Sequence, residues 1–323
     1  MGQYEDKTIP SLKFSASDAK AIYTWLVDPF GGGVPKDRAL LMTNEQARGT
    51  PMKVRLRDVL DQAGPEDELF LFFTGHGVPR IKEGGAMDDG MLLPYDADNR
   101  STGALEESGV KLNDLKGWVN RSKAKTVFLA LDACFSGTGE HSFSRLEGGK
   151  GFVVEEDRSI LKSIASAPGR ALLASSSAKQ ESFEDKRWGG GLFASFLLKA
   201  LQGEADTNED GILTVAEVAS FLGKKVPSEA RKARGKDQNP ELLGEGGFEL
   251  TYNPRLVALA VPAIAEGKLK KALASGAITF DQATAASQEI KGGKYSHVLR
   301  QFLVGKSDAK NFGVNYKPEE IEK

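Results

Sequence analysis

Two short and almost wholly apolar segments constrain the fold more than any other feature of the sequence. They are Glu68–Thr74, which reads ELFLFFT, and Thr126–Asp132, which reads TVFLALD. Neither shows the alternation of polar and apolar residues that is expected of a strand with one face in water. Continuous apolar runs of this length are typical of strands that are buried on both faces, as in parallel sheets covered by helices.

The segments around them alternate between helix-like and strand-like patterns. We expect helices at residues 14–28, 50–63, 111–121, 192–201 and 214–225, and further strands at 38–43, 171–174 and 247–252. Residues 79–109 are expected to be mainly loop. The alternation predicts an α/β fold in which a mainly parallel sheet is sandwiched by helices. Residues 254–323 differ from the rest, because they suggest three short helices that form a small helical extension of unknown role.

The composition excludes several classes of partner. The 323 residues include 45 acidic and 43 basic side chains, so the charge indicates neither a nucleic acid nor a membrane surface as partner. No apolar run reaches the length of a membrane span, and the first ten residues lack the apolar core of a signal peptide. The single cysteine precludes a disulfide within the chain and favours a cytoplasmic protein.

Residues that can carry chemistry follow both apolar strands. His76 lies two residues after Thr74, and Cys134, the only cysteine, lies two residues after Asp132. Because the carboxyl ends of neighbouring parallel strands meet at one edge of a sheet, we expect His76 and Cys134 to lie close together. An imidazole beside a thiol can take up its proton and produce a nucleophilic thiolate.

Other interpretations of these residues remain open. A lone cysteine after an apolar strand is often only a small buried hydrophobic residue, and a histidine after a strand is often only a loop residue. His141 is an alternative base, and His297 in the helical extension is expected on the surface. We favour His76 as the base, because the glycines on both sides of it allow substrate and backbone to approach closely.

The segments around these residues resemble the two catalytic motifs of the caspase-like cysteine peptidases. The first motif is LFFTGHG at residues 71–77 and the second is LDACFSG at residues 131–137. The distance of 58 residues between His76 and Cys134 is also similar to that in the family. Shorter similar stretches extend the resemblance to about residues 4–252, most of all to metacaspases and their bacterial relatives. It implies a cysteine endopeptidase that acts on proteins or peptides and needs no cofactor for its chemistry.

The resemblance also implies domain boundaries. It predicts a peptidase domain at residues 1–253, with a large-subunit part at 1–137, a linker at 138–170 and a small-subunit part at 171–253, followed by the extension at 254–323. The family has a central apolar strand that ends where this chain begins, at Met1. Either the sequence starts too late, which we favour and which would also remove an upstream signal, or another strand takes that place.

A pocket for the side chain before the scissile bond is a further implication of the resemblance. In metacaspases this pocket prefers Arg or Lys, and its walls fall on Ser15, Asp18, Thr74 and Asp132. The residues agree in part, because Asp132 points to the same face of its strand as Cys134, and its carboxylate would pair with a basic side chain. Alternatively, Asp18 only caps its helix and Asp132 only accepts a hydrogen bond from a neighbouring backbone amide.

Two more features follow from the resemblance. The backbone N–H groups of Gly77 and Cys134 are expected to stabilise the oxyanion. The linker 138–170 is often cut in the family, so basic residues within it are candidate self-cleavage sites, with a merely solvated loop as the alternative. These residues are Arg145, Lys150, Arg158, Lys162 and Arg170.

Residues 206–217, which read DTNEDGILTVAE, fit the calcium-binding loop of an EF-hand. Gly211 suits the sharp turn of such a loop, and six oxygen ligands would surround a Ca²⁺ ion. The ligands would be the side chains of Asp206, Asn208, Asp210, Thr214 and Glu217 and the carbonyl of Ile212. Without a metal, the same residues would form a helix-capping turn. We expect possible Ca²⁺ binding to stabilise the small-subunit part.

Two rival functions remain beside the peptidase. One is a catalytically idle caspase-like scaffold, and the other is a calcium-responsive interaction module whose thiol is incidental. The sequence has no phosphate-binding loop, no dinucleotide-binding glycine motif and no nucleophile elbow. The pairing of the sole cysteine with a histidine at a strand end favours the peptidase.

Overall fold

The computed structural model describes residues 1–29, 31–81, 87–133, 159–177, 180–256, 262–293, 295–305 and 307–318. Cys134 and His141 therefore lie outside the described residues. The chain divides into two compact units. The first comprises residues 1–207 and 213–250, and the second comprises residues 208–212 and 251–323.

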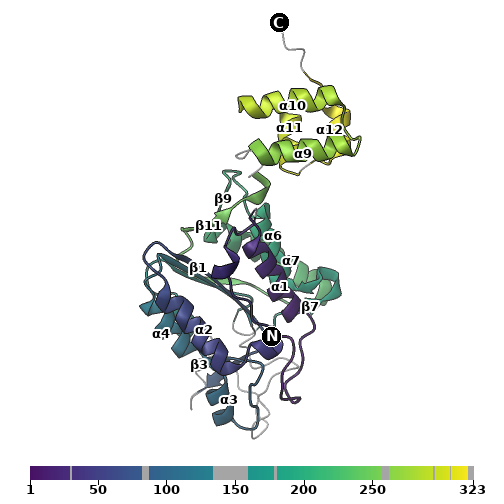
Figure 1. Ribbon diagram of the computed structural model, residues 1–323. Helices are drawn as coiled ribbons and strands as arrows, with labels where there is room; N and C mark the ends of the chain where they lie inside the picture. Colours follow the sequence, from purple (N-terminus) through teal and green to yellow (C-terminus); the bar gives the residue numbers. More distant parts are fainter. Residues whose placement is uncertain are drawn as a thin grey trace. The chain divides into compact units, whose positions relative to one another are not determined.

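A four-stranded sheet forms the centre of the first unit, with its strands in the order β1-β5-β6-β10 (Figure 1). β1 (Glu68–Thr74), β5 (Thr126–Asp132) and β6 (Arg170–Ala174) are parallel, and β10 (Glu241–Gly244) is antiparallel to β6. The predicted fold class is thus confirmed. The sequence did not indicate β10. The strand expected at 247–252 is β11 (Glu249–Tyr252), which joins β9 (Ile212–Thr214) in a separate two-stranded sheet.

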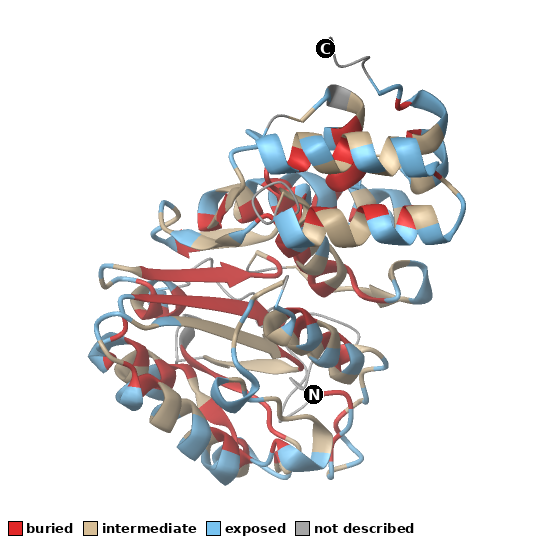
Figure 2. Ribbon diagram, turned by 45° about the horizontal axis from the view of Figure 1, so that its top comes forward, coloured by how far each residue is buried: buried red, intermediate tan, exposed pale blue. Residues whose placement is uncertain are grey.

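Helices cover both faces of this sheet, because successive side chains of a strand point to opposite faces. Alternate residues of β5, such as Leu129 and Phe128, belong to two different hydrophobic cores. The first core includes α2 (Gly49–Gln62), α4 (Leu112–Arg121) and α5 (Ser159–Ile164). The second includes α1 (Ser15–Val27), α6 (Leu192–Lys199) and α7 (Val215–Arg234). β5 and β6 are buried along their whole length (Figure 2).

β1 is less buried than its apolar sequence predicts. It lies at one edge of the sheet, and Thr74 is its only buried residue. The strand expected at 38–43 is wrong: Lys36–Arg38 form the 3-10 turn η1, the residues after it belong to no strand, and Leu40 is 53% exposed. Within the described part of the chain, no second strand pairs with β1, so none takes the place of the family's first strand.

Residues 79–109 contain more regular structure than the loop that we expected. β2 (Gly77–Ile81), β3 (Met87–Leu92) and β4 (Val110–Lys111) form an antiparallel sheet, and α3 (Thr102–Ser108) precedes β4. Pro79 in β2 and Asp88, Asp89 and Gly90 in β3 are residues of low strand propensity. Because of these residues, the sequence pattern did not predict β2 and β3.

The remaining elements of the first unit are short. They are η2 (Asn44–Gln46), β7 (Glu184–Asp185), η3 (Lys186–Trp188), β8 (Gly190–Gly191) and the π-helical turn η4 (Ala200–Glu204). In the ranges that the structure describes, no helix is both long and apolar enough to cross a membrane.

The second unit consists mainly of helices around a core of its own. They are α9 (Pro262–Ala274), α10 (Phe280–Gly292), α11 (His297–Leu303) and α12 (Ala309–Asn315). The rings of Phe302 and Phe312 stack at 4.5 Å in this core. The first three helices were expected. The sequence did not indicate α12, which is only seven residues long and contains Gly313, a poor helix former.

A buried guanidinium joins β6 to the end of α4. Arg170 is 5% exposed and donates hydrogen bonds to the carbonyls of Ser122 at 2.8 Å, Ala124 at 3.0 Å and Val119 at 3.3 Å. A positive charge is favourable near the carbonyls at a helix C-terminus, although desolvation by burial lowers the pKa of Arg170. Arg170 therefore caps α4 and is not an accessible residue of a linker.

Arg170→Ala is expected to lower the free energy of unfolding by about 2–4 kcal/mol, because it leaves buried carbonyls without donors and opens a cavity. Chemical denaturation would measure the change. Lys162→Ala on the exposed side of α5 is the control and should change stability by less than about 0.5 kcal/mol. An Arg170→Ala protein as stable as the wild type would contradict the capping role.

Candidate active site

The candidate site begins where β1 and β5 end side by side. In their parallel register Thr74 lies opposite Asp132, and the backbone N–H of Gly75 donates to the carbonyl of Asp132 at 3.2 Å. His76 and Cys134 each follow these paired residues by two positions in the sequence. Because Cys134 lies outside the described residues, its pairing with His76 stays a prediction.

The imidazole of His76 is held from two sides. Its Nε2 lies 2.8 Å from the carbonyl oxygen of Pro10. Since a carbonyl can only accept, Nε2 carries the proton, and in the neutral ring Nδ1 carries the lone pair. On the other side the ring stacks on that of Tyr4, with centroids 5.3 Å apart and an angle of 29° between the planes. The tautomer that results leaves Nδ1 as the basic atom.

The backbone around His76 is fixed as well. Its N–H donates to the hydroxyl of Tyr4 at 2.9 Å, and its carbonyl accepts from the N–H of Leu93 at 3.0 Å. Gly77, the expected oxyanion donor, is the first residue of β2 and pairs with Leu92 of β3. The small antiparallel sheet that the sequence did not reveal therefore fixes the chain immediately after His76.

Two buried carboxylates lie beside this strand edge. Asp18 projects from α1 and accepts a hydrogen bond from the backbone N–H of Gly191 at 2.9 Å. Burial, together with the charges of Asp132 and Glu184, raises the pKa of Asp18 to about 7, although the Gly191 hydrogen bond opposes the rise. The alternative that Asp18 caps its helix is wrong, because the N-cap residue is Phe14 and no side chain caps there.

Asp132 at the end of β5 is the second of these carboxylates. Burial raises its pKa to about 6, against the effect of hydrogen bonds from the Ser182 and Ser175 hydroxyls, and the charge of Glu184 contributes to the rise. The two hydroxyls also hydrogen-bond to each other. The alternative prediction was that the Asp132 carboxylate only accepts a hydrogen bond from a neighbouring backbone amide. Its partners are instead the side chains of two serines in the segment after β6.

Two glycines of the small-subunit part make room for the carboxylates. A Cβ atom at Gly190 would lie 2.1 Å from Oδ1 of Asp18, and one at Gly191 would lie 3.1 Å from Oδ2 of both Asp18 and Asp132. Because both Oδ2 atoms lie 3.1 Å from the same point at Gly191, the carboxylates of Asp18 and Asp132 lie close to each other. A side chain at Gly190 would displace Asp18. The run of glycines at residues 189–191 is therefore a sequence signal that could have revealed the close approach of this segment to the two carboxylates, but the sequence analysis did not use it.

The structure brings together the four residues that were predicted to line the pocket. Thr74 is adjacent to Asp132 through the strand register, and Asp18 approaches Asp132 at Gly191. Ser15 lies one turn before Asp18 on α1, and all four side chains are buried. The result is a buried cluster of two carboxylates and two hydroxyls at the carboxyl ends of β1 and β5, and its role as an acidic substrate pocket stays a prediction.

Glu184 is a further charged residue of this region that the sequence did not reveal. Its carboxylate accepts from the backbone N–H groups of Lys13 at 2.8 Å and Phe14 at 3.1 Å. It therefore satisfies backbone N–H groups at the N-terminus of α1, where a serine side chain would be the usual cap. The hydroxyl of Ser17 instead donates to the Phe14 carbonyl. No local sequence pattern could link residues that are 170 positions apart.

The residues of the predicted self-cleavage segment fall into two groups. Arg145, Lys150 and Arg158 lie outside the described residues. Lys162 is exposed on α5, and Arg170 is buried in β6. Self-cleavage stays a prediction, and buried Arg170 is the least accessible of the described candidates.

The predicted calcium ligands are engaged in local hydrogen bonds. Asn208 accepts from the N–H of Asp210 at 3.0 Å, and Asp210 accepts from the N–H of Ile212 at 2.8 Å. Glu217 accepts from the N–H and hydroxyl of Thr214 in the capping box of α7. Asp206 is buried. Among the described residues, no group of three or more acidic, His or Cys side chains is placed to hold a metal ion. The helix-capping turn is present, and Ca²⁺ binding stays a prediction.

The sheet, its two helical layers and the histidine at the strand edge define a caspase-like α/β protein. The chain belongs to the caspase-domain family, whose family model matches residues 2–245.

The solved structures that are similar to this chain include two of low sequence identity. The Geobacter sulfurreducens protein GSU0716 is 12% identical, with a TM-score of 0.47, and the match covers 76% of this chain and 91% of that protein. Caspase-1 from Spodoptera frugiperda is 14% identical, with a TM-score of 0.47, and the match covers 77% of this chain and 85% of the caspase. No curated protein sequence matches the chain.

The raised pKa values predict how stability depends on pH. A carboxyl group whose pKa is about 7 in the folded state binds protons more readily there than in the unfolded chain. The contribution of Asp18 to the free energy of unfolding should therefore fall as the pH rises from about 4 to about 7, and then level off, whereas the buried Met1 amino group, whose pKa is lowered to about 5, contributes in the opposite direction. Asp18→Asn should weaken this decline and be more stable than the wild type at pH 8, by up to about 2–4 kcal/mol. Denaturation at several pH values tests this, with Asp61→Asn on exposed α2 as the charge control. Equal slopes for Asp18→Asn and the wild type would contradict it.

Millimolar Ca²⁺ is expected to raise the melting temperature, because an ion that binds only the folded state stabilises it. Glu217→Gln is the sharpest variant, since glutamine preserves a capping box but loses the bidentate carboxylate. It should abolish the Ca²⁺ effect and change stability little in its absence. A melting temperature that does not respond to Ca²⁺ in the wild type would refute the prediction, with Mg²⁺ as the ionic control.

Proposed function

We propose that this chain is a cysteine endopeptidase that hydrolyses peptide bonds after Arg or Lys, with Cys134 as nucleophile and His76 as general base. The observation that carries the proposal is the register of β1 and β5. Asp132 pairs with Thr74 at the strand ends that lead into His76 and Cys134, and Asp18 approaches Asp132 at Gly191, which supports the proposed acidic pocket beside these residues. Membership of the caspase-domain family supports the reaction class.

The proposed chemistry has two steps. Nδ1 of His76 takes the proton of the Cys134 thiol, and the sulfur attacks the scissile carbonyl carbon. The tetrahedral oxyanion accepts hydrogen bonds from the backbone N–H groups of Gly77 and Cys134. The imidazolium then protonates the departing amine, which leaves a thioester. In the second step, water gives a proton to His76 and attacks the thioester carbonyl, and the C–S bond then breaks. The carboxylic acid product leaves, and the imidazolium returns its proton to the Cys134 sulfur.

The charge of the pocket supports a basic side chain before the scissile bond. The charge of Asp132 raises the pKa of Asp18, because one buried carboxylate disfavours the charge of its neighbour. A guanidinium or ammonium group would relieve this repulsion and pair with both. An acidic side chain would add a third buried negative charge and be rejected. Because the carboxyls must be ionised to bind a cation, the KM for a basic substrate should fall as the pH rises from about 5 to 7.

The rival functions are the idle scaffold and the calcium-responsive interaction module. The scaffold needs no charged pocket beside a strand edge, and the buried carboxylates are costly to keep without a ligand to pair with them. The hydrogen bond from Nε2 of His76 to the Pro10 carbonyl also supports the peptidase over the scaffold, because a fixed tautomer is useful for a residue that transfers protons.

Fluorogenic peptides that end in Arg, Lys or Asp would test the proposal. We expect cleavage after Arg or Lys but not after Asp, and no cleavage by Cys134→Ala. Asp132→Asn keeps the hydrogen-bonding shape of the side chain but removes its charge, so it should lower kcat/KM for the Arg peptide by roughly 10- to 100-fold. Its control is Asp61→Asn.

The outcomes separate the candidates. Preferred cleavage after Asp would overturn the assigned specificity. A folded protein that cleaves none of the peptides, with and without Ca²⁺, and whose Cys134 shows no enhanced alkylation at neutral pH would favour the scaffold or the interaction module.

A further inference from the structure

The segment that encloses His76 comes from the beginning of the chain. Residues 4–10, which we call the N-terminal loop, supply the hydroxyl that accepts from the His76 N–H, the ring that stacks on the imidazole, and the carbonyl that accepts from Nε2. Two of these three contacts come from Tyr4. Its side chain is 1% exposed, so it is fixed in place by the core.

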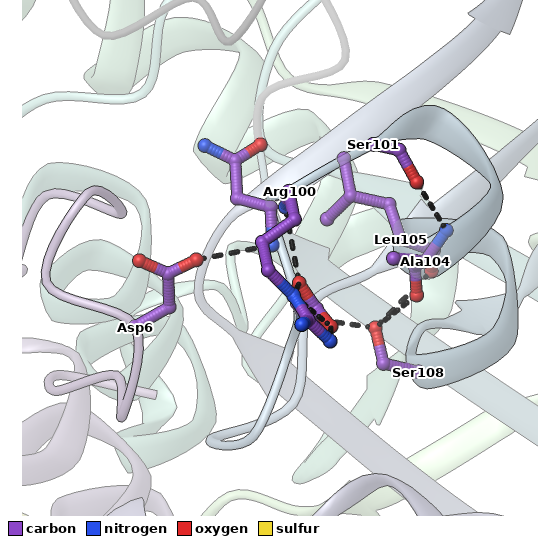
Figure 3. A network of polar contacts seen from close by, with 8 residues as sticks. Asp6, Arg100, Ser101, Ala104, Leu105 and Ser108 are labelled. Carbon is purple, nitrogen blue, oxygen red and sulfur yellow. Dashed lines mark hydrogen bonds and ion pairs between the residues drawn. The ribbon is translucent and has the colours of Figure 1, made fainter.

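Polar contacts on the side away from His76 hold the N-terminal loop in place. Asp6 accepts from the backbone N–H of Asn99 at 3.1 Å (Figure 3). It also accepts from the backbone N–H of Thr8 at 2.8 Å. Glu5 donates its N–H to the carbonyl of Tyr95 at 2.8 Å, and its carboxylate pairs with Arg48 at 2.9 Å. The turn at residues 95–100 is therefore the support on which the N-terminal loop rests.

Figure 3 shows the hydrogen bonds that hold the turn at residues 95–100 in place. Arg100 folds back onto Asp98, the hydroxyl of Ser101 caps α3, and Ser108 at the end of α3 accepts from the N–H of Asp98 at 3.0 Å. Contacts thus run without a gap from α3 through the 95–100 turn and the N-terminal loop to His76.

We propose that Tyr4 is a positioning residue for His76, whose hydroxyl fixes the backbone of the base and whose ring fixes the plane of the imidazole. The role rests on the proposed function of His76 as general base. Tyr4 reaches neither the substrate nor the reacting atoms in this role. It acts by holding Nε2 toward Pro10, which directs Nδ1 to the opposite side of the ring.

Two physical consequences follow from this geometry. Without the hydroxyl, a partly buried backbone N–H loses its acceptor, which loosens the residue that must hold its place to within a fraction of an ångström. Without the ring, the imidazolium loses the aromatic face that lies within the distance at which a cation is stabilised. The first change affects the position of the base, and the second affects its pKa.

The experiment compares Tyr4→Phe, which keeps the ring, with Tyr4→Leu, which keeps only an apolar side chain. Long-range proton–nitrogen NMR spectra of ¹⁵N-labelled protein in a Cys134→Ala background would report the tautomer and pKa of His76 without interference from the thiol. The chain has three histidines, so substitution of His141 and His297 assigns the signals. Peptide cleavage by the same variants in the Cys134 background gives kcat and KM. Tyr252→Phe, at a tyrosine that is 65% exposed, is the matched control.

We expect the Nε2-protonated tautomer in the wild type and in Tyr4→Phe. Tyr4→Leu should lower the pKa of His76 by about 0.5 unit relative to Tyr4→Phe and populate both tautomers. Its kcat should fall by at least about 10-fold with little change in KM, whereas Tyr4→Phe should lose a few-fold. If Tyr4→Leu does not fold, Asp6→Ala, which loosens the loop from its support, should lower kcat several-fold at unchanged KM.

A folded Tyr4→Leu protein with the wild-type tautomer, pKa and kcat would overturn the positioning role, and so would a pKa that changes equally in both Tyr4 variants. Failure of the proposed function has a different signature, since the wild type itself would then cleave no peptide. The NMR comparison would still report on the geometry in that case.

Discussion

The parallel pairing of β1 with β5 is the constraint on which the rest of this structure depends. Because Thr74 lies opposite Asp132, a shift of the register by one residue would send the pocket-lining side chains to the wrong face of the sheet. The pairing is maintained by apolar side chains of β5 that enter the cores on both faces. The interiors of β1 and β5 are wholly apolar, so polar side chains lie only at the two ends of these strands.

The acidic pocket shows how much local structure is needed to keep two carboxylates out of water. Asp18 receives a backbone N–H from a segment without Cβ atoms, and Asp132 receives two hydroxyls. These donors reduce the desolvation cost but do not remove it, because the pKa of each group remains above its usual range. The Met1 amino group opposes the rise in both pKa values, and this attraction between a cation and the two carboxylates is the interaction on which the proposed specificity relies.

Strands and site residues could be predicted from the sequence only where one continuous segment contained the whole pattern that identifies them. The uniform apolar runs of β1 and β5 predicted their strands, and the residues after them predicted which edge would carry the site. Tyr4 and Glu184 could not be found in this way, because each acts on a partner 72 or 170 residues away. The strands β2 and β3 were missed because Pro79 and the Asp-Asp-Gly sequence oppose strand formation locally, and pairing between them overrides that preference. The strand expected at 38–43 failed for the converse reason: it has the right composition but no partner in the described part of the chain.

The contacts of Arg170 and Glu184 have a consequence for the integrity of the chain. Arg170, on the small-subunit side, donates to carbonyls at residues 119–124, and Glu184 holds the amides at residues 13 and 14. β5 and β6 add a ladder of five residue pairs between the same two parts. The covalent connection between Ala133 and Ser159 is thus only one of several ties. The two parts of the folded unit are therefore held together by noncovalent contacts as well as by the chain itself.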